Sequence, residues 1–136
     1  MNHETIFFSL LILFILCVGL FMYLVQYAYS GKNKLSPSQA IQMLNSGELN
    51  HIVDVRSNIE WNIGHHPTAI NIPVSQINED TLRIFQKNDG ILVYCNTGQR
   101  ARYASEKIKS YGFENVYYIA TTFHSIMPND VSTKQD

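Results

Sequence analysis

The sequence is poor in cysteine: only two of its 136 residues, Cys17 and Cys95, carry a thiol. Cys17 lies inside a long apolar run near the N-terminus, where we expect it to serve packing and not to meet Cys95. This excludes an internal disulfide in the rest of the chain. A free thiol outside the apolar run is typical of a protein in a reducing compartment.

A large net charge is also absent. Ten Lys and Arg residues are balanced by eleven Asp and Glu residues, and all of them except Glu4 follow residue 31. Without a basic excess, the sequence does not indicate a nucleic-acid partner. No spacing of histidine, cysteine and carboxylate residues is typical of a metal site either, and we predict neither a metal nor another cofactor.

One long apolar run is present at the N-terminus. The twenty residues from Ile6 to Val25 carry no charge. At about 1.5 Å per residue, a helix of this length spans about 30 Å, the thickness of the hydrocarbon core of a bilayer. We therefore predict a transmembrane helix over residues 6–29, after an N-terminal flank over residues 1–5. Three aromatic residues near its end favour the headgroup zone: Tyr23, Tyr27 and Tyr29.

A cleaved signal peptide is the main alternative to this membrane anchor. A signal peptide requires a basic N-terminal region and a shorter apolar core, whereas Met1–Thr5 contains no Lys or Arg. The uncleaved anchor is therefore favoured. Because Lys32 and Lys34 follow the helix, the positive-inside rule places the C-terminal domain in the cytoplasm. The sequence thus predicts a single-pass membrane protein.

The remainder of the chain is predicted to form one domain. A polar linker over residues 30–34 precedes a domain over residues 35–128, and a polar tail over residues 129–136 follows. Apolar spacing, N-caps and glycine stops predict helices over residues 36–47, 57–63, 80–86 and 100–111. Short apolar runs predict strands over residues 52–55, 69–72, 91–94 and 116–119. This alternation predicts an α/β fold in which a parallel-rich sheet is flanked by helices on both faces.

Cys95 lies where a predicted strand turns into a predicted helix. The apolar residues Ile91–Tyr94 end directly before it, and an apolar face with helical spacing begins at Ala101. The first amide groups of a helix have no partner within the helix, and their partial positive charge favours an anion. This position therefore favours a reactive thiolate. The alternative is that Cys95 is simply a small buried residue.

Two segments together resemble the rhodanese domain. Asp54–Pro73 contains the elements D-x-R, E-W, G-H-x-P and A-x-N-I-P of that family. About 40 residues later, Cys95–Arg100 matches its C-x-x-G-x-R active-site loop. The resemblance covers about Leu35 to Ile126. It implies a single rhodanese-like domain with sulfurtransferase activity.

The resemblance also implies a role for each residue of the loop. Cys95 would attack a small sulfane-sulfur donor, hold the sulfur as a persulfide and pass it to a thiol or protein acceptor. In this family the loop surrounds the sulfur with the backbone amides of the residues that follow the cysteine. Those residues are here Asn96, Thr97, Gly98, Gln99 and Arg100.

Charged side chains of the two segments are expected to support the loop. Arg100 is the side chain that we expect to attract an anionic donor. Asp54, Arg56 and Glu60 are expected to form a structural set of ion pairs, because Arg56 and Glu60 are four residues apart across a helix start.

The sequence departs from the family pattern in two places that bear on the pocket, besides Thr68, which replaces a common glycine in a turn. Asn96 and Thr97 are neutral, where family members usually carry small or basic residues that help to recruit thiosulfate. The donor therefore stays open between thiosulfate and another sulfane-sulfur compound. Ala120–Ile126 stands where the family often has a Gly-Gly pair and a tryptophan, so we expect the pocket rim and the last helix to differ.

Two other functions compete with sulfur transfer. A phosphatase of the same fold has a longer loop with an arginine six positions after the cysteine, and that position is Ala101 here. Without this guanidinium a phosphoryl group loses its main partner. The second alternative is a non-catalytic, membrane-tethered interaction module that keeps only the fold. The presence of Cys95 favours the enzyme.

Overall fold

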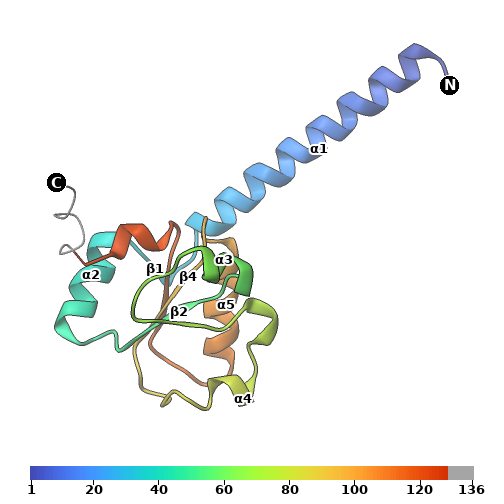
Figure 1. The fold of residues 1–136 in the computed structure, drawn as a ribbon. Coiled ribbons are helices and arrows are strands. Elements are labelled where there is room, and N and C mark those ends of the chain that lie inside the picture. The colour runs from blue at the N-terminus through green and yellow to red at the C-terminus, as the bar shows by residue number, and fades with distance from the viewer. Residues whose placement is uncertain (129–136) are drawn as a thin grey trace.

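The computed structural model describes residues 1–128, and its first element is a long helix that projects away from the rest of the molecule (Figure 1). Helix α1, His3–Tyr29, begins after Asn2, whose side-chain oxygen accepts a hydrogen bond from the Thr5 amide at 3.0 Å. Among the described residues it is the one helix long and apolar enough to cross a membrane. Its large apolar side chains are exposed, so α1 is not the core helix of a soluble domain. It is a candidate membrane span.

The rest of the described chain is built around a single parallel sheet. Five strands lie in the order β1-β5-β4-β2-β3, and every neighbouring pair is parallel. The strands are β1 Lys34–Leu35, β2 His51–Asp54, β3 Ala69–Asn71, β4 Ile91–Tyr94 and β5 Val116–Ile119. The predicted α/β architecture is confirmed. Because β4 is the central strand and is buried along its length, the residue that follows it emerges at the carboxyl edge of the sheet, where such sheets bind ligands.

Helices cover both faces of the sheet, as predicted. They are α2 Pro37–Ser46, α3 Asn58–Ile63, α4 Glu79–Leu82 and α5 Gln99–Ser110, with the 3-10 helices η1 Val74–Gln76 and η2 Phe123–Ile126. Successive side chains of β4 enter two different cores. Ile91 and Val93 pack with α4 and α5, whereas Leu92 and Tyr94 pack with α2 and η2. The side chains of β4 are therefore buried on both faces of the sheet, as expected for a parallel sheet that helices cover on both sides.

Helices α2 and α3, both predicted, begin at capping boxes formed by a serine. At α2 the Ser36 hydroxyl accepts from the Gln39 amide at 3.2 Å, and the Gln39 side chain accepts from the Ser36 amide at 2.9 Å. Ser57 and Glu60 make the same exchange at α3. These reciprocal bonds satisfy amides that the first turn of a helix leaves free.

The helix predicted over residues 80–86 is shorter and starts earlier. Asn78 caps α4, because its side-chain oxygen accepts a hydrogen bond from the Thr81 amide at 3.0 Å. The amide of Gln86 donates to the Asp89 carboxylate at 2.9 Å. That amide therefore cannot continue the helical ladder, and the chain turns toward β4.

The linker predicted over residues 30–34 is packed against the domain. The Tyr118 hydroxyl donates to the Ala28 carbonyl at 2.5 Å, and Ala28 is fully buried. The buried side chain of Asn33 donates to the Val116 carbonyl at 3.3 Å, and Lys34 already belongs to β1. The end of α1 is thus fixed on β5 and α5. The polar tail predicted over residues 129–136 lies outside the described residues.

Candidate active site

Cys95 occupies the turn between β4 and α5. Its Sγ accepts a hydrogen bond from the Gly98 amide at 3.1 Å and lies 3.4 Å from the Ala101 amide nitrogen, which also donates to it. The residue is only 1% exposed. Burial by itself disfavours a charged thiolate, so its stabilisation depends on these amides and on the N-terminus of α5. This is the placement that the sequence predicts for a nucleophilic cysteine.

Gly98 gives the loop its shape. It precedes α5 with φ of 103°, a left-handed conformation that L side chains rarely adopt. Its surroundings are also full: a β-carbon there would lie 2.8 Å from the Ala120 Cα and 3.2 Å from the Ala28 Cβ. The loop is therefore packed between the segment that follows β5 and the last turn of α1. Sequence reasoning missed Ala28, because nothing in a lone alanine of an apolar helix marks it as a packing partner of a distant loop.

The polar side chains of the loop bind one another and α3. The Asn96 amide donates to a Glu60 carboxylate oxygen at 2.7 Å. The Thr97 hydroxyl donates to the side-chain oxygen of Gln99. Thr97 is exposed and Gln99 is half-buried. The contacts to the sulfur itself come from the main-chain amides of Gly98, which belongs to the predicted set, and of Ala101, which does not.

Arg100 is paired with Glu60. Its two terminal nitrogens donate to the two carboxylate oxygens at 2.8 and 3.0 Å. This pairing lowers the pKa of Glu60 to about 2 and raises the pKa of Arg100. The expected ion pair of Glu60 with Arg56 is therefore wrong: a bidentate partner forty positions along the chain takes its place, since a planar guanidinium matches a carboxylate. Arg100, which we expected to attract an anionic donor, is thus already paired with the Glu60 carboxylate.

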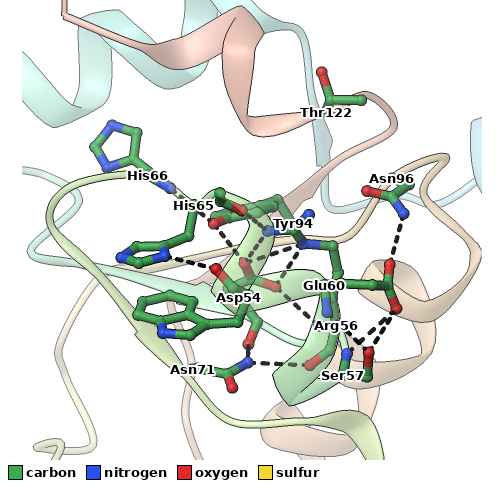
Figure 2. A network of polar contacts seen from close by, with 12 residues as sticks. Asp54, Arg56, Ser57, Glu60, His65, His66, Asn71, Tyr94, Asn96 and Thr122 are labelled. Atoms are coloured by element: carbon green, nitrogen blue, oxygen red, sulfur yellow. Dashed lines mark hydrogen bonds and ion pairs between the residues drawn. The ribbon is translucent and has the colours of Figure 1, made fainter.

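A second ion pair, between Asp54 and Arg56, is buried (Figure 2). Arg56 donates to Asp54 at 2.7 Å through one terminal nitrogen and at 3.0 Å through Nε. The Tyr94 hydroxyl donates to the same carboxylate at 2.7 Å and accepts from the His66 amide at 3.1 Å. Asn71 donates to the Arg56 carbonyl. This network joins β2, β4 and the turn after α3.

Burying the charges of this network costs desolvation free energy, but its buried polar side-chain atoms all have hydrogen-bond partners. Burial and the Asp54 hydrogen bond raise the pKa of Tyr94, so its hydroxyl stays a donor. The hydrogen bond to Asp54 raises the pKa of Arg56. A buried charge pair persists where all partners are supplied. Tyr94 is the member that sequence reasoning missed, because it reads as an ordinary strand residue.

The neighbouring histidines have structural contacts. His65 stacks on Trp61 with ring centroids 3.4 Å apart, and a ring nitrogen lies 2.9 Å from the Trp61 carbonyl oxygen. His66 is buried, and burial lowers its pKa. Among residues 1–128, no three His, Cys, Asp or Glu side chains gather closely enough to hold a metal ion.

A cysteine held by main-chain amides at the carboxyl end of a central parallel strand defines a class of α/β domains that use a thiolate as nucleophile. The chain belongs to the rhodanese-like domain family, whose model matches residues 36–127. This is a sulfurtransferase family. The resemblance to the rhodanese domain, which the Asp54–Pro73 and Cys95–Arg100 segments carry, is therefore confirmed at the level of the family.

Curated proteins and solved structures show the same relationship. The chain is 41% identical over 73 residues to the tRNA uridine(34) hydroxylase of Buchnera aphidicola, covering 50% of this chain and 23% of that protein. It is 34% identical over 77 residues to the adenylyltransferase and sulfurtransferase uba4 of Ogataea parapolymorpha, covering 56% and 20%. A rhodanese-like domain protein from Staphylococcus aureus superposes with a TM-score of 0.60 at 25% identity, covering 71% and 93%. The chain thus spans less than a quarter of these two curated relatives, and their whole activities do not transfer to it.

Proposed function

We propose that this chain is a membrane-anchored sulfurtransferase that carries sulfane sulfur as a persulfide on Cys95. The observation that carries the proposal is the pair of amides, from Gly98 and Ala101, at 3.1 and 3.4 Å from the Cys95 sulfur. They can stabilise the attacking thiolate and, after loading, an anionic persulfide in the same place.

The transfer proceeds in two displacements at sulfur. In loading, the Cys95 thiolate attacks the terminal sulfur of a persulfide R–S–SH. A new S–S bond to Cys95 forms, the S–S bond of the donor breaks, and R–S⁻ leaves. In unloading, an acceptor thiolate attacks the outer sulfur of Cys95–S–SH, and Cys95 leaves as a thiolate. Each step exchanges one S–S bond for another, so no external oxidant or reductant is needed.

The charge distribution favours donors other than thiosulfate. The guanidinium of Arg100 is held by both oxygens of Glu60, and the loop residues Asn96 and Thr97 are neutral. A dianion near this site gains little from a cation that is already paired. An organic persulfide has less charge to desolvate, and we therefore propose it as the preferred donor.

The membrane anchor is part of the proposal. Its support is the apolar composition of α1, the exposure of its side chains and the tyrosines at its end. With Lys32 and Lys34 after the helix, we place the domain in the cytoplasm and expect its donor or acceptor to be met at the membrane surface, where tethering raises the effective concentration.

Cyanolysis with a panel of donors tests the function. The protein in detergent micelles is incubated with thiosulfate or an organic persulfide, the excess donor is removed by gel filtration, and cyanide is then added to remove the outer sulfur as thiocyanate. We expect thiocyanate from the wild type, more with the persulfide than with thiosulfate, and none from Cys95→Ser. A wild type that yields no more thiocyanate than Cys95→Ser with any donor would leave the interaction module as the better description.

The names of the relatives point to more than one chemistry. That of the Ogataea protein includes a sulfurtransferase activity, whereas the Buchnera protein is a hydroxylase. Sulfur transfer is the chemistry that the Cys95 loop by itself accounts for, since the step needs only a thiolate and an anion-stabilising loop.

A further inference from the structure

A pocket lies between the end of α1 and the start of α5, directly beside the Cys95 loop. Its volume is about 310 Å³. The catalytic loop and its helix contribute Gln99, Arg100 and Tyr103, η1 contributes Val74, and α1 contributes Leu24 and Tyr27. One wall is therefore the C-terminal end of the candidate membrane span, and another is the last part of the loop that surrounds the sulfur.

The lining of this pocket is suited to an apolar ligand. Leucine, valine and the tyrosine rings make most of its surface, and Tyr103 is 52% exposed at its edge. Its one charged lining residue, Arg100, has its guanidinium engaged by Glu60. Such a pocket removes apolar surface from water but offers no unpaired cation to a small anion.

The α1 wall of the pocket is held in place. The Arg102 guanidinium lies 4.0 Å from the centre of the Tyr27 ring and donates to the Tyr27 carbonyl. The Tyr118 hydroxyl donates to the carbonyl of the buried Ala28. These contacts fix the helix end on α5 and β5, so the pocket is a feature of the folded chain and not a gap beside a loose tether.

The pocket also lies at a defined place along the span. Tyr23 and Leu24 lie at the end of the apolar run and Tyr27 follows just after it, and tyrosines concentrate where the hydrocarbon core meets the headgroups. A molecule with an apolar chain and a polar head gathers at that depth. It could enter the pocket from the bilayer, with its head close to the loop.

We propose that this pocket binds the apolar chain of a membrane-dissolved thiol, which serves as the sulfur acceptor of Cys95. This inference rests on the proposed function and names its substrate class. The thiolate R–S⁻ attacks the outer sulfur of Cys95–S–SH, the S–S bond to Cys95 breaks, and the products are R–S–SH and the Cys95 thiolate. The step is reversible, so the same pocket serves the persulfide of that thiol as a donor.

A series of n-alkyl thiols tests the proposal on the full-length protein in phosphatidylcholine vesicles. The protein is loaded to the Cys95 persulfide, and the loss of the outer sulfur is followed by mass spectrometry after addition of ethanethiol, butanethiol or octanethiol. Cyanide, which has no chain, gives the reference rate for each variant. We expect the octanethiol rate divided by the cyanide rate to fall about tenfold in Tyr103→Ser.

Tyr111→Ser is the matched control. Tyr111 is a partly exposed tyrosine at the other end of α5 and lines a different pocket. We expect this variant to keep the wild-type ratio within about twofold. The comparison also removes the partition of the thiol into the vesicle, which is the same for all three proteins. Competition by n-octanol in the wild type and not in Tyr103→Ser would further support an apolar subsite.

Two results separate the failure of this inference from the failure of the proposed function. Sulfur transfer to cyanide with equal ratios in the wild type, Tyr103→Ser and Tyr111→Ser would overturn the apolar-thiol subsite and leave the sulfurtransferase intact; the pocket would then belong to a partner side chain or a second copy of the chain. No persulfide on the wild type would overturn the proposed function and this inference with it.

Discussion

At the scale of single residues, the candidate site combines the Cys95 sulfur with two ion pairs, one buried and one partly exposed. Cys95 is held by main-chain amides, Asp54 and Arg56 are buried, and Glu60 and Arg100 are partly exposed beside the loop. Apart from proline, a substituted side chain leaves the main-chain N–H in place, so the ion pairs are the parts of the site that mutagenesis reaches most directly.

Glu60 should make the domain sensitive to acid. Its pKa is lowered from 4.5 to about 2, mainly by the hydrogen bond from Arg100. A carboxyl with a lowered pKa contributes stability above its unfolded value, and that contribution is lost as the pH falls from about 4.5 through about 2. We expect Glu60→Gln to be less stable than the wild type at pH 6 and to lose less stability across this pH window. Urea unfolding at a series of pH values measures both, and parallel curves for the two proteins would contradict the assignment.

Tyr94 should matter for stability because its hydroxyl serves two buried partners. In Tyr94→Phe the Asp54 carboxylate loses a donor and the His66 amide loses its acceptor. We expect a loss of about 1–3 kcal/mol in the free energy of unfolding, measured by urea denaturation. Tyr117→Phe, on the half-buried surface of β5, is the control and should change stability by less than about 0.5 kcal/mol. Equal effects of the two substitutions would mean that the network contributes nothing specific.

At the scale of elements, the sequence predicted those helix starts that depend on hydrogen bonds between residues close together in the chain. The N-cap signal at Ser36 and the capping-box pattern at Ser57 marked two helix starts correctly, because both halves of each bond lie within four residues. β1 was missed because it has two residues and exists only through its pairing with β5. The Glu60–Arg100 pair was missed for the same reason: the i, i+4 spacing favoured Arg56, and only the tertiary fold brings Arg100 to the carboxylate.

The α1 helix is more than a tether in this arrangement, because Ala28 packs against the loop glycine. We expect Ala28→Leu to displace α1 or Gly98, at a cost of about 1–3 kcal/mol for overpacking, and to slow alkylation of Cys95 by iodoacetamide at neutral pH. Gly19→Leu is the control on the same helix, since a β-carbon at Gly19 meets nothing within 4 Å. The two variants are compared in the same detergent. Unchanged alkylation in Ala28→Leu would show that the loop does not depend on the helix.

At the scale of the whole molecule, the rhodanese-like domain is fixed at one end of a candidate membrane span. The docking of Ala28 and Asn33 on the domain means that the loop has one orientation relative to α1. A rigid junction of this kind would hold the mouth of the apolar pocket at the membrane surface. The family match describes residues 36–127 and so could not have shown this.

The proposed orientation across the membrane rests on the two lysines after α1. We expect the domain to resist protease added to intact bacterial spheroplasts that express the full-length protein, and to be digested once the membrane is permeabilised. The positive-inside rule is the physical basis of this expectation. Substituting Lys32 and Lys34 by glutamine should increase the fraction that is digested in intact spheroplasts. Digestion of the wild type without permeabilisation would place the domain on the outer side.

Intact-protein mass spectrometry of the sulfur-loaded chain tests the central claim most directly. After incubation with an organic persulfide and removal of the excess, we expect the wild type and Cys17→Ser to gain the mass of one sulfur atom, removable by cyanide, and Cys95→Ser to gain none. A wild type that gains no sulfur, or a gain that persists in Cys95→Ser, would contradict a persulfide held by the Cys95 loop.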